Sequence, residues 1–511
     1  MPSHECTKAG LPGRAARFAG RASRRGGVLV VAAFALAVAG LALVTAPPAN
    51  AARPLELGFT SFGDSLFVDP DPAVRNLWLD RASQAGAGIV LLGAGWSNVA
   101  PANPPAGFNP RDPADPAYSW ERVDAAVRAA TAHGFKVMLL VTRAPRWAEG
   151  PDRPDLPVEV LEPGTWKPDP GALGDFATAL ATRYSGAFVD PADPGSGPLP
   201  QVRRWQLWAE PNLTLRLAPQ YEGGKRFAPD HYRRMLDSFY TAIKAIAPSN
   251  TVVTGGLGPY GDPPNGVRTR PLAFYRDLLC LRGRKKLKRA PCPEKPQFDV
   301  LAHHPITLRG GPRQSAIHPD DAGSADLGEV RKVLRAAERA HTIEPGGRHP
   351  LWATEFWWAS NPPTVEEPAP NPQKQARRIE ESLYLYWQGG ASVAIMLQIS
   401  DTPGGPTGDF LTGGTGLYFM DGTPKPALTA FRFPFVADRL FGARTRAWGR
   451  APVAGKLLIE RRSGGGEWRT IKRLNVERQA VFNTQVRAKG RAKLRARIGA
   501  DQSLIWRLPG A

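Results

Sequence analysis

The feature that most constrains the fold of this chain is a regular alternation of short apolar runs with longer segments of helical period, between residues 55 and 436. Short apolar runs are typical of buried strands, and apolar residues spaced three and four apart are typical of helices. The expected strands cover residues 55–60, 88–92, 136–142, 202–208, 251–256, 298–303, 350–355 and 393–399. The expected helices cover residues 72–85, 120–133, 171–184, 229–247, 271–281, 326–341, 373–389 and 426–436.

Eight strands, each followed by a helix, predict an α/β fold in which a parallel sheet closes into a (β/α)8 TIM barrel. Beyond residue 438, short runs separated by glycine or polar turns show no helical period and predict a small all-β sandwich. We therefore expect a signal peptide over residues 1–51, a barrel domain over 52–437 and a basic β-sandwich domain over 438–511.

The first 51 residues have the organisation of an export signal. Six Lys or Arg residues precede the apolar run 28–46, and Ala49-Asn50-Ala51 has the small-x-small form of a signal-peptidase site. We expect a secreted, extracellular protein, associated with the cell wall, with no stable membrane span after signal cleavage. The alternative is a retained membrane anchor, because the apolar run is nearly long enough to span a bilayer.

Only two cysteines, Cys280 and Cys292, remain beyond the signal segment. In an oxidising compartment this pair closes the basic loop 281–291, with a stabilisation of roughly 3 kcal/mol. The spacing fits no metal motif, and no nucleotide motif occurs elsewhere in the chain. We therefore expect a disulfide, no metal and no cofactor.

The positive charge of the chain is concentrated near its C-terminus. The net charge is +20, and residues 444–497 hold sixteen Lys or Arg against three Glu. A secreted module of this kind is expected to bind an anionic cell-wall polymer, an interaction that salt weakens. The alternative is a solvated arginine-rich surface. We expect no nucleic-acid partner, because the chain has no nucleic-acid-binding motif.

Two glutamates stand at the ends of expected strands. Glu210 follows the apolar stretch 202–208, and Glu355 follows the apolar residues 350–353. Carboxyl ends of parallel strands face a common cleft, so two carboxylates there predict paired acid and base chemistry. Taken singly, each has a structural alternative: Glu210 before Pro-Asn could start a helix, and Glu355 could pair with an arginine.

The residues around these two carboxylates resemble those of the clan A glycoside hydrolases. Ala209-Glu210-Pro211-Asn212 and Thr354-Glu355 stand where that clan has its catalytic motifs, on strands four and seven. The pattern Trp-x-x-Trp-x-Glu-Pro-Asn over 205–212 and the segment 416–425 are most similar to families 5 and 39, in particular to cellulase-like secreted actinobacterial members. The resemblance covers about residues 52–436.

The resemblance implies a secreted retaining glycoside hydrolase that cleaves O-glycosidic bonds of a polysaccharide or oligosaccharide, with Glu210 as acid/base and Glu355 as nucleophile. It also implies that His304 lines the sugar site, with His303 on the opposite face of the strand; a satisfied buried histidine is the alternative. The residues expected to bind substrate are Trp96, Trp147, Trp208, Asn212, His304, Trp357 and Trp358.

Three departures from the clan pattern define a rival hypothesis. Ala209 stands where the clan has an asparagine, Ile306 replaces the tyrosine after His-Pro, and residues 394–398 lack a tryptophan. A catalytically impaired carbohydrate-binding barrel with a basic anchoring module is the alternative function. A third hypothesis is a cell-surface adhesion module centred on the basic sandwich.

Overall fold

The computed structural model describes residues 52–60, 65–360, 371–402 and 413–508. The expected signal peptide lies outside these residues, so export and the membrane-anchor alternative stay predictions. Within the described ranges, no helix is both long enough and apolar enough to cross a bilayer.

Eight short strands form one sheet in the order β10-β11-β12-β1-β2-β3-β4-β7, and every neighbouring pair in it is parallel. The two outer strands meet through single bridges, Val253 to Val300 and Leu257 to His303, which bring the sheet's edges together. The predicted (β/α)8 barrel is therefore confirmed. The strands are β1 Glu56–Thr60, β2 Ile89–Gly93, β3 Lys136–Val141, β4 Arg204–Leu207, β7 Thr251–Val253, β10 Leu301–His303, β11 Leu351–Phe356 and β12 Ala391–Met396.

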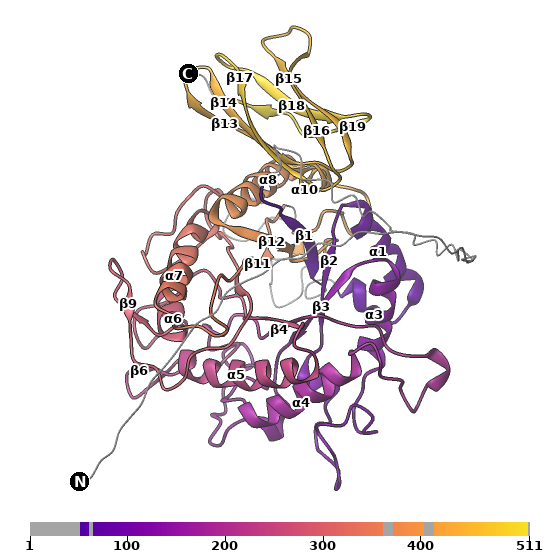
Figure 1. Ribbon diagram of the computed structural model, residues 1–511, viewed down its shortest axis with the longest axis vertical. Coiled ribbons are helices and arrows are strands. Elements are labelled where there is room, and N and C mark those ends of the chain that lie inside the picture. Colours follow the sequence, from indigo (N-terminus) through magenta and orange to yellow (C-terminus); the bar gives the residue numbers. More distant parts are fainter. Residues whose placement is uncertain (1–51, 61–64, 361–370, 403–412, 509–511) are drawn as a thin grey trace, which may run out of the picture. The chain divides into compact units, whose positions relative to one another are not determined.

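Helices surround this sheet (Figure 1). Several begin with a proline that follows a capping residue: the side chains of Asp71, Asp169 and Asn371 accept from backbone N–H groups in the first turns of α1, α4 and α8. The helices after the strands are α1 Pro72–Gln84, α3 Glu121–Ala132, α4 Pro170–Arg183, α5 Ala228–Ile246, α6 Pro271–Leu278, α7 Leu327–Arg339, α8 Pro372–Gly389 and α10 Pro426–Arg432.

The barrel strands are apolar on both faces, as their near-continuous hydrophobic runs require. In β2, Val90 and Leu92 belong to the large core shared with the helices, whereas Ile89 and Leu91 belong to a separate cluster with residues of β3, β7, β11 and β12. The second cluster fills the inside of the barrel. The interior is thus packed, and a site can form only at the strand ends.

The C-terminal strands form two antiparallel sheets, ordered β13-β14-β17 and β16-β15-β18-β19, with β20 paired to β18. This confirms a sandwich-like region. Its strands are β13 Phe435–Phe441, β14 Arg444–Arg450, β15 Gly455–Arg462, β16 Arg469–Val476, β17 Val481–Arg487, β18 Lys493–Ile498, β19 Asp501–Gln502 and β20 Trp506–Arg507.

The expected helix over 426–436 ends earlier than predicted. Helix α10 stops at Arg432, because Pro434 cannot continue a helix and Phe435 already begins β13. The predicted boundary between residues 437 and 438 falls inside β13. The division into domains stays a prediction.

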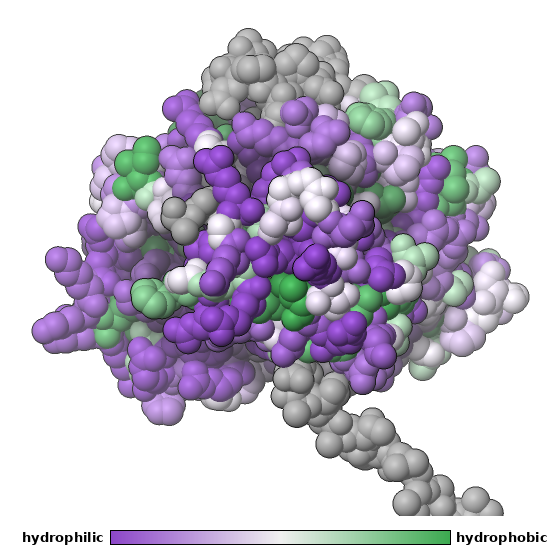
Figure 2. All heavy atoms as spheres, turned by 90° about the horizontal axis from the view of Figure 1, so that it is seen from above, coloured by the Kyte–Doolittle hydropathy of each residue, from purple (hydrophilic) through white to green (hydrophobic). Residues whose placement is uncertain are grey.

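The face shown in Figure 2 is mostly hydrophilic, and its hydrophobic side chains lie in small separate groups. Isolated surface hydrophobics of this kind are normal in folded proteins.

Candidate active site

The chain bends sharply where β4 ends. Trp208 and Glu210 both have left-handed backbone conformations, with φ of 68° and 50°. Hydrogen bonds hold the bend: the Trp208 N–H donates to the Val141 carbonyl at 2.7 Å, and the Glu210 N–H donates to the Gly256 carbonyl at 2.8 Å. Such conformations cost on the order of 1–3 kcal/mol each and are concentrated at functional sites. The bend presents Glu210 at the strand end.

The structure brings three of the predicted residues together. The Nδ1 atom of His304, which follows β10, lies 3.2 Å from Oε1 of Glu210 and 3.8 Å from Oε2 of Glu355. Because both contacts share one nitrogen, the two oxygens are no farther apart than the sum of these distances, 7.0 Å. His304 is 2% exposed, and the two glutamates are 19% and 17% exposed. The cluster is largely screened from water.

A glycine makes room for the histidine. A Cβ atom at Gly256 would lie 2.1 Å from Cδ2 of His304, 2.3 Å from its Nε2 and 2.8 Å from the Thr354 hydroxyl oxygen. No side chain fits there without moving the imidazole. Gly256 therefore sets the position of His304 as well as accepting the backbone hydrogen bond of Glu210.

His304 controls the charge of Glu210. Burial disfavours the ionised carboxylate, but the hydrogen bond from His304 and its positive charge outweigh burial and hold the pKa of Glu210 below its ordinary value. Burial also lowers the pKa of His304, yet the charges of Glu355 and Glu210 raise it above the ordinary histidine value. The imidazolium and the Glu210 carboxylate stabilise each other.

Glu355 has the opposite tendency. Burial and the negative charge of Glu210 raise the pKa of Glu355 above its ordinary value, although His304 and Arg216 act against them. The two carboxyl groups thus have pKa values pushed apart, as acid/base chemistry requires. In the ligand-free site the proton is held more readily by Glu355 than by Glu210.

A small pocket opens on these carboxylates. Its volume is about 50 Å³, room for only a few water molecules. It is lined by Thr142, Arg143, Glu162, Thr165, Trp208, Ala209, Glu210, Arg216 and Glu355. A second cleft of about 490 Å³ lies at the ends of β2 and β3 and shares Thr142 and Arg143 with the first. The two spaces form adjoining parts of one face of the barrel.

Trp208 and Asn212 flank Glu210, and their side chains make different hydrogen bonds. Trp208 is among the residues that line the pocket, but it is only 1% exposed, and its indole N–H donates to the Arg216 carbonyl at 2.7 Å. The Asn212 side chain is buried, donates to the carbonyls of Gly258 and Thr269, and accepts from the Gly258 N–H at 2.8 Å. Asn212 therefore ties the loop after β7 to the turn that carries Glu210.

The structure does not bring Trp96 and Trp147 to the carboxylates. Trp96 is fully buried, stacked on Phe176 and edge-on to Trp147. Trp147 is partly exposed, donates its indole N–H to the Pro101 carbonyl, and lines a different surface pocket.

The two tryptophans after Glu355 point in different directions. Trp357 packs with Ile306 and Leu397, two positions that depart from the clan pattern, in a small apolar cluster beyond the ends of β10, β11 and β12. Trp358 is buried and donates its indole N–H to the Ser382 hydroxyl of α8 at 2.7 Å. Trp357 lies beside the site, and Trp358 belongs to the core.

His303 lies away from the pocket. Its Nε2 is 2.9 Å from the Ala322 carbonyl, its Nδ1 is 3.2 Å from the Tyr275 hydroxyl, and burial lowers its pKa to about 4. Neutral and fully paired, this histidine is structural, whereas its neighbour His304 faces the two glutamates.

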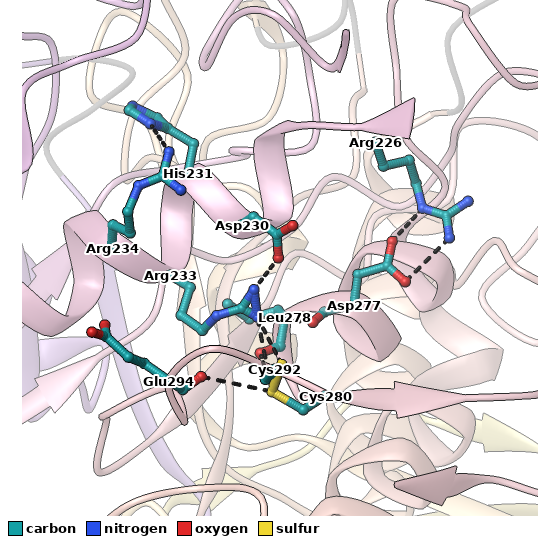
Figure 3. Close-up of polar contacts among 10 residues, drawn as sticks. All are labelled: Arg226, Asp230, His231, Arg233, Arg234, Asp277, Leu278, Cys280, Cys292 and Glu294. Carbon is teal, nitrogen blue, oxygen red and sulfur yellow. Dashed lines mark hydrogen bonds and ion pairs between the residues drawn. A yellow bond between two sulfur atoms is a disulfide. The ribbon is translucent and has the colours of Figure 1, made fainter. Parts of the chain in front are cut away.

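The predicted disulfide between Cys280 and Cys292 is confirmed, with 5.6 Å between the Cα atoms. Figure 3 shows it beside Arg233 of α5, whose guanidinium donates to Sγ of Cys292 at 3.0 Å and pairs with Asp230. The disulfide fastens the end of α6 to the segment that leads into β10.

Sequence reasoning missed Arg143, Arg216 and Gly256. Arg143 follows an expected strand directly, and Gly255-Gly256 ends another. Their positions at the carboxyl ends of expected strands are a sequence signal that could have identified them. Arg216 lies six residues beyond Glu210, and its ion pair with Glu162 at 2.6 Å joins two loops whose contact no local pattern shows.

The fold is a parallel (β/α)8 barrel with two carboxylates at its strand ends, and it can be compared with known proteins of this class. No family model matches the sequence, and no curated protein matches it. In structure the chain is similar to glycoside hydrolases of families 39 and 5, the group to which its motifs show resemblance. The sequence identities to these structures are below 20%.

The first of these structures is a family 39 glycoside hydrolase from the gut symbiont Bacteroides cellulosilyticus WH2, with 17% identity, 86% of this chain and 81% of that chain covered, and a TM-score of 0.48. A GH5_18 protein from Bifidobacterium longum subsp. infantis has 12% identity, coverage of 74% and 78%, and a TM-score of 0.44. Cel5A of Thermotoga maritima has 13% identity, coverage of 74% and 98%, and a TM-score of 0.40.

Proposed function

We propose that this protein is a secreted retaining glycoside hydrolase acting on a polysaccharide or oligosaccharide. The observation that carries the proposal is the cluster in which His304 contacts both Glu210 and Glu355 at the strand ends of a parallel barrel. Hydrolysis of a glycosidic bond needs two carboxyl groups that differ in protonation, and the charges in this cluster push the two pKa values apart.

The separation of the two carboxylates supports retention of configuration. Retaining enzymes place their carboxyl groups about 5–5.5 Å apart, and inverting enzymes place them about 6.5–9.5 Å apart to admit a water. The upper bound of 7.0 Å between the two oxygens that contact His304 covers the whole retaining range and excludes most of the inverting range.

In the proposed reaction, Glu355 attacks the anomeric carbon while Glu210 gives its proton to the departing glycosidic oxygen. A new bond forms from the Glu355 oxygen to the anomeric carbon as the glycosidic bond breaks. Glu210 then takes a proton from water, whose oxygen attacks the anomeric carbon and releases Glu355. The surrounding burial strengthens each of these charge interactions.

These roles require Glu210 to carry the proton and Glu355 to be ionised, the reverse of the ligand-free order. His304 supplies a route to that reversal, because its Nδ1 lies only slightly farther from Glu355 than from Glu210. Movement of the imidazole towards Glu355 would lower the pKa of Glu355 and would allow the pKa of Glu210 to rise. We expect substrate binding to cause this shift.

The ligand-free pocket must widen to admit a sugar ring. Arg143 and Arg216 line it, and both are long side chains that are only partly buried. The adjoining cleft at the ends of β2 and β3 offers space for further sugar units of a chain. Carbohydrate is therefore the proposed substrate.

The small pocket and Ala209 favour the second candidate, a carbohydrate-binding barrel with impaired turnover. Ala209 lines the pocket and offers no hydrogen bond to a sugar hydroxyl. The two candidates are separated by incubating purified protein with aryl glycosides and wall polysaccharides. Release of aglycone or reducing sugar supports the hydrolase, and glycan binding without release supports the binding barrel.

The assignment of roles has its own test. In Glu355→Gln, azide should restore turnover by attacking the anomeric carbon directly and should give a glycosyl azide of inverted configuration. In Glu210→Gln, azide should intercept the glycosyl-enzyme and give a product of retained configuration. The opposite pairing of variant and product would exchange the two roles.

A further inference from the structure

A short hairpin with six basic residues projects from the barrel beside α6. Strands β8 Leu281–Arg282 and β9 Lys288–Arg289 pair antiparallel, and Figure 1 shows β9 at the periphery, outside α6. All six basic side chains are exposed. They are Arg282, Arg284, Lys285, Lys286, Lys288 and Arg289.

These charges are largely uncompensated. Arg284, whose Nε lies 3.6 Å from Asp320, is the one member of the six with a carboxylate partner in the part of the chain that the structure describes. Asp320 already pairs closely with Arg276, and the nearby Asp277 pairs with Arg226 (Figure 3). The hairpin thus carries a strong local positive field.

The hairpin holds like charges against each other. Arg282 and Lys288 are directly opposite in the register, an arrangement that destabilises a two-stranded ribbon. The disulfide at its base, Cys280 to Cys292, keeps the hairpin closed, and the Ala290 N–H donates to the Cys280 carbonyl at 2.7 Å. A covalent clasp therefore fixes a cationic surface that would otherwise open, which lowers the entropic cost of binding.

We propose that this hairpin, residues 281–289, is a docking site for an anionic polysaccharide. The chemistry it recognises is a row of sulfate, carboxylate or phosphate groups on a glycan chain. The segment has no aromatic residue on which nucleic-acid bases could stack, and Leu281 is buried, so neither a nucleic acid nor a membrane surface fits as well. The choice of a carbohydrate polymer rests on the proposed function.

The hairpin lies outside the pocket that contains Glu210 and Glu355. The hairpin belongs to the connection from α6 to β10, and although Arg284 reaches Asp320 in the connection from β10 to α7, none of the hairpin's residues lines the pocket at Glu210 and Glu355. A polymer held there would keep the enzyme on its substrate without entering the pocket. Changes in the hairpin should therefore leave hydrolysis of a small aryl glycoside unchanged.

The test compares two charge-reduced variants of equal net charge. The hairpin variant removes four exposed charges without a carboxylate partner, and the control removes four exposed charges from the C-terminal sheets. The hairpin variant is Lys285→Gln, Lys286→Gln, Lys288→Gln and Arg289→Gln; the control is Arg469→Gln, Lys472→Gln, Arg473→Gln and Arg487→Gln. Binding of labelled dextran sulfate, polygalacturonate, unmodified dextran and duplex DNA is measured at increasing NaCl concentration.

We expect the full chain to bind dextran sulfate or polygalacturonate and not dextran, with affinity that falls as salt rises; the two polyanions distinguish a sulfate from a carboxylate source. The hairpin variant should lose about tenfold or more in affinity, and the control less than about twofold, because the proposal assigns docking to the hairpin and takes the C-terminal sheets as the solvated arginine-rich surface of the alternative. Equal losses in both variants, or tighter binding of DNA than of either glycan, would overturn the proposal. Absence of hydrolysis in the wild type would contradict the proposed function and leave this comparison intact.

Discussion

At the scale of single residues, the site depends on how closely Gly256 approaches His304. An added methyl group at residue 256 would overlap the imidazole and push it away from both carboxylates. We predict that Gly256→Ala lowers kcat/KM by about 100-fold or more, because displacements near 1 Å cost rates of that order. Circular dichroism should show a folded barrel.

Gly174→Ala is the matched control for this substitution. A Cβ atom there would lie no closer than 3.6 Å to any neighbour, and the residue sits in helix α4 away from the site. Wild-type activity in Gly256→Ala would mean that the position of His304 does not matter for turnover.

A second residue-scale prediction concerns pH. The pKa of His304 is raised in the folded protein, so its stabilising contribution is complete below the unfolded value of 6.5 and is lost as pH rises through the folded value. The pKa of Glu210 is lowered, so its contribution is present above 4.5 and is lost as pH falls through the folded value. The pair therefore stabilises most between about pH 4.5 and 6.5.

We expect the free-energy difference between wild type and His304→Gln to be largest in this window and smaller at pH 9. Urea unfolding at a series of pH values measures it. His341→Asn, a change on an exposed residue, controls for the loss of an imidazole. A difference that grows steadily up to pH 9 would contradict an ion pair between His304 and Glu210.

Much of the candidate site could be predicted from the sequence, because Glu210 and His304 come within three residues after a strand, Glu355 lies near the end of one, and parallel strands gather their ends. Trp96 and Trp358 could not be placed in the same way. Both stand near strand ends, but which side of the backbone a ring takes depends on loop conformation and on packing against α4 and α8. Periodicity within a strand does not extend into the loop after it.

At the scale of elements, the disulfide is a local clasp with a measurable effect. Replacing Cys280 and Cys292 by alanine removes a cross-link between residues twelve apart. We expect the free energy of unfolding to fall by about 2–3 kcal/mol, since closing a loop of this size restricts the unfolded chain. Reduction of the wild type with dithiothreitol should give a similar loss. No change in urea midpoint in either sample would show that the clasp contributes nothing to stability.

The order and type of the barrel elements could be predicted because the spacing of apolar residues within each strand or helix is a local property of the sequence. The ends could not, because the expected helix over 426–436 extends into β13. Residues 426–436 continue an apolar pattern through Phe431, Phe433 and Phe435, so the end of α10 was hidden. Strand β14 pairs with β17, which lies more than thirty residues away, and β13 pairs with β14.

At the scale of the whole molecule, a buried glutamate joins the barrel to the C-terminal sheets. The Glu380 side chain of α8 is fully buried, accepts from Arg377 at 2.7 Å and from the Phe435 N–H of β13 at 3.3 Å. Burial raises its pKa to about 8. A raised carboxyl pKa means that the folded state binds more protons than the unfolded state, so stability falls as pH rises from 4.5 to about 8.

Glu380→Gln removes this titration while keeping the size and the hydrogen-bond acceptor. Between pH 5.5 and 9 we expect wild type to lose on the order of 3 kcal/mol of stability relative to the variant. Glu121→Gln, on an exposed helix position, is the control. Parallel pH profiles for wild type and Glu380→Gln would show that this carboxyl group is ionised in the folded state.

In the proposed reaction, Glu210 and Glu355 together hydrolyse glycosidic bonds. The most direct measurement is release of aglycone from a panel of aryl glycosides by purified wild type, Glu355→Gln and Glu121→Gln. We predict that wild type and Glu121→Gln hydrolyse at least one glycoside. In Glu355→Gln we expect the rate to fall by about 1000-fold or more, because the variant lacks the nucleophile that forms the covalent intermediate. Equal rates in all three proteins would contradict the claim.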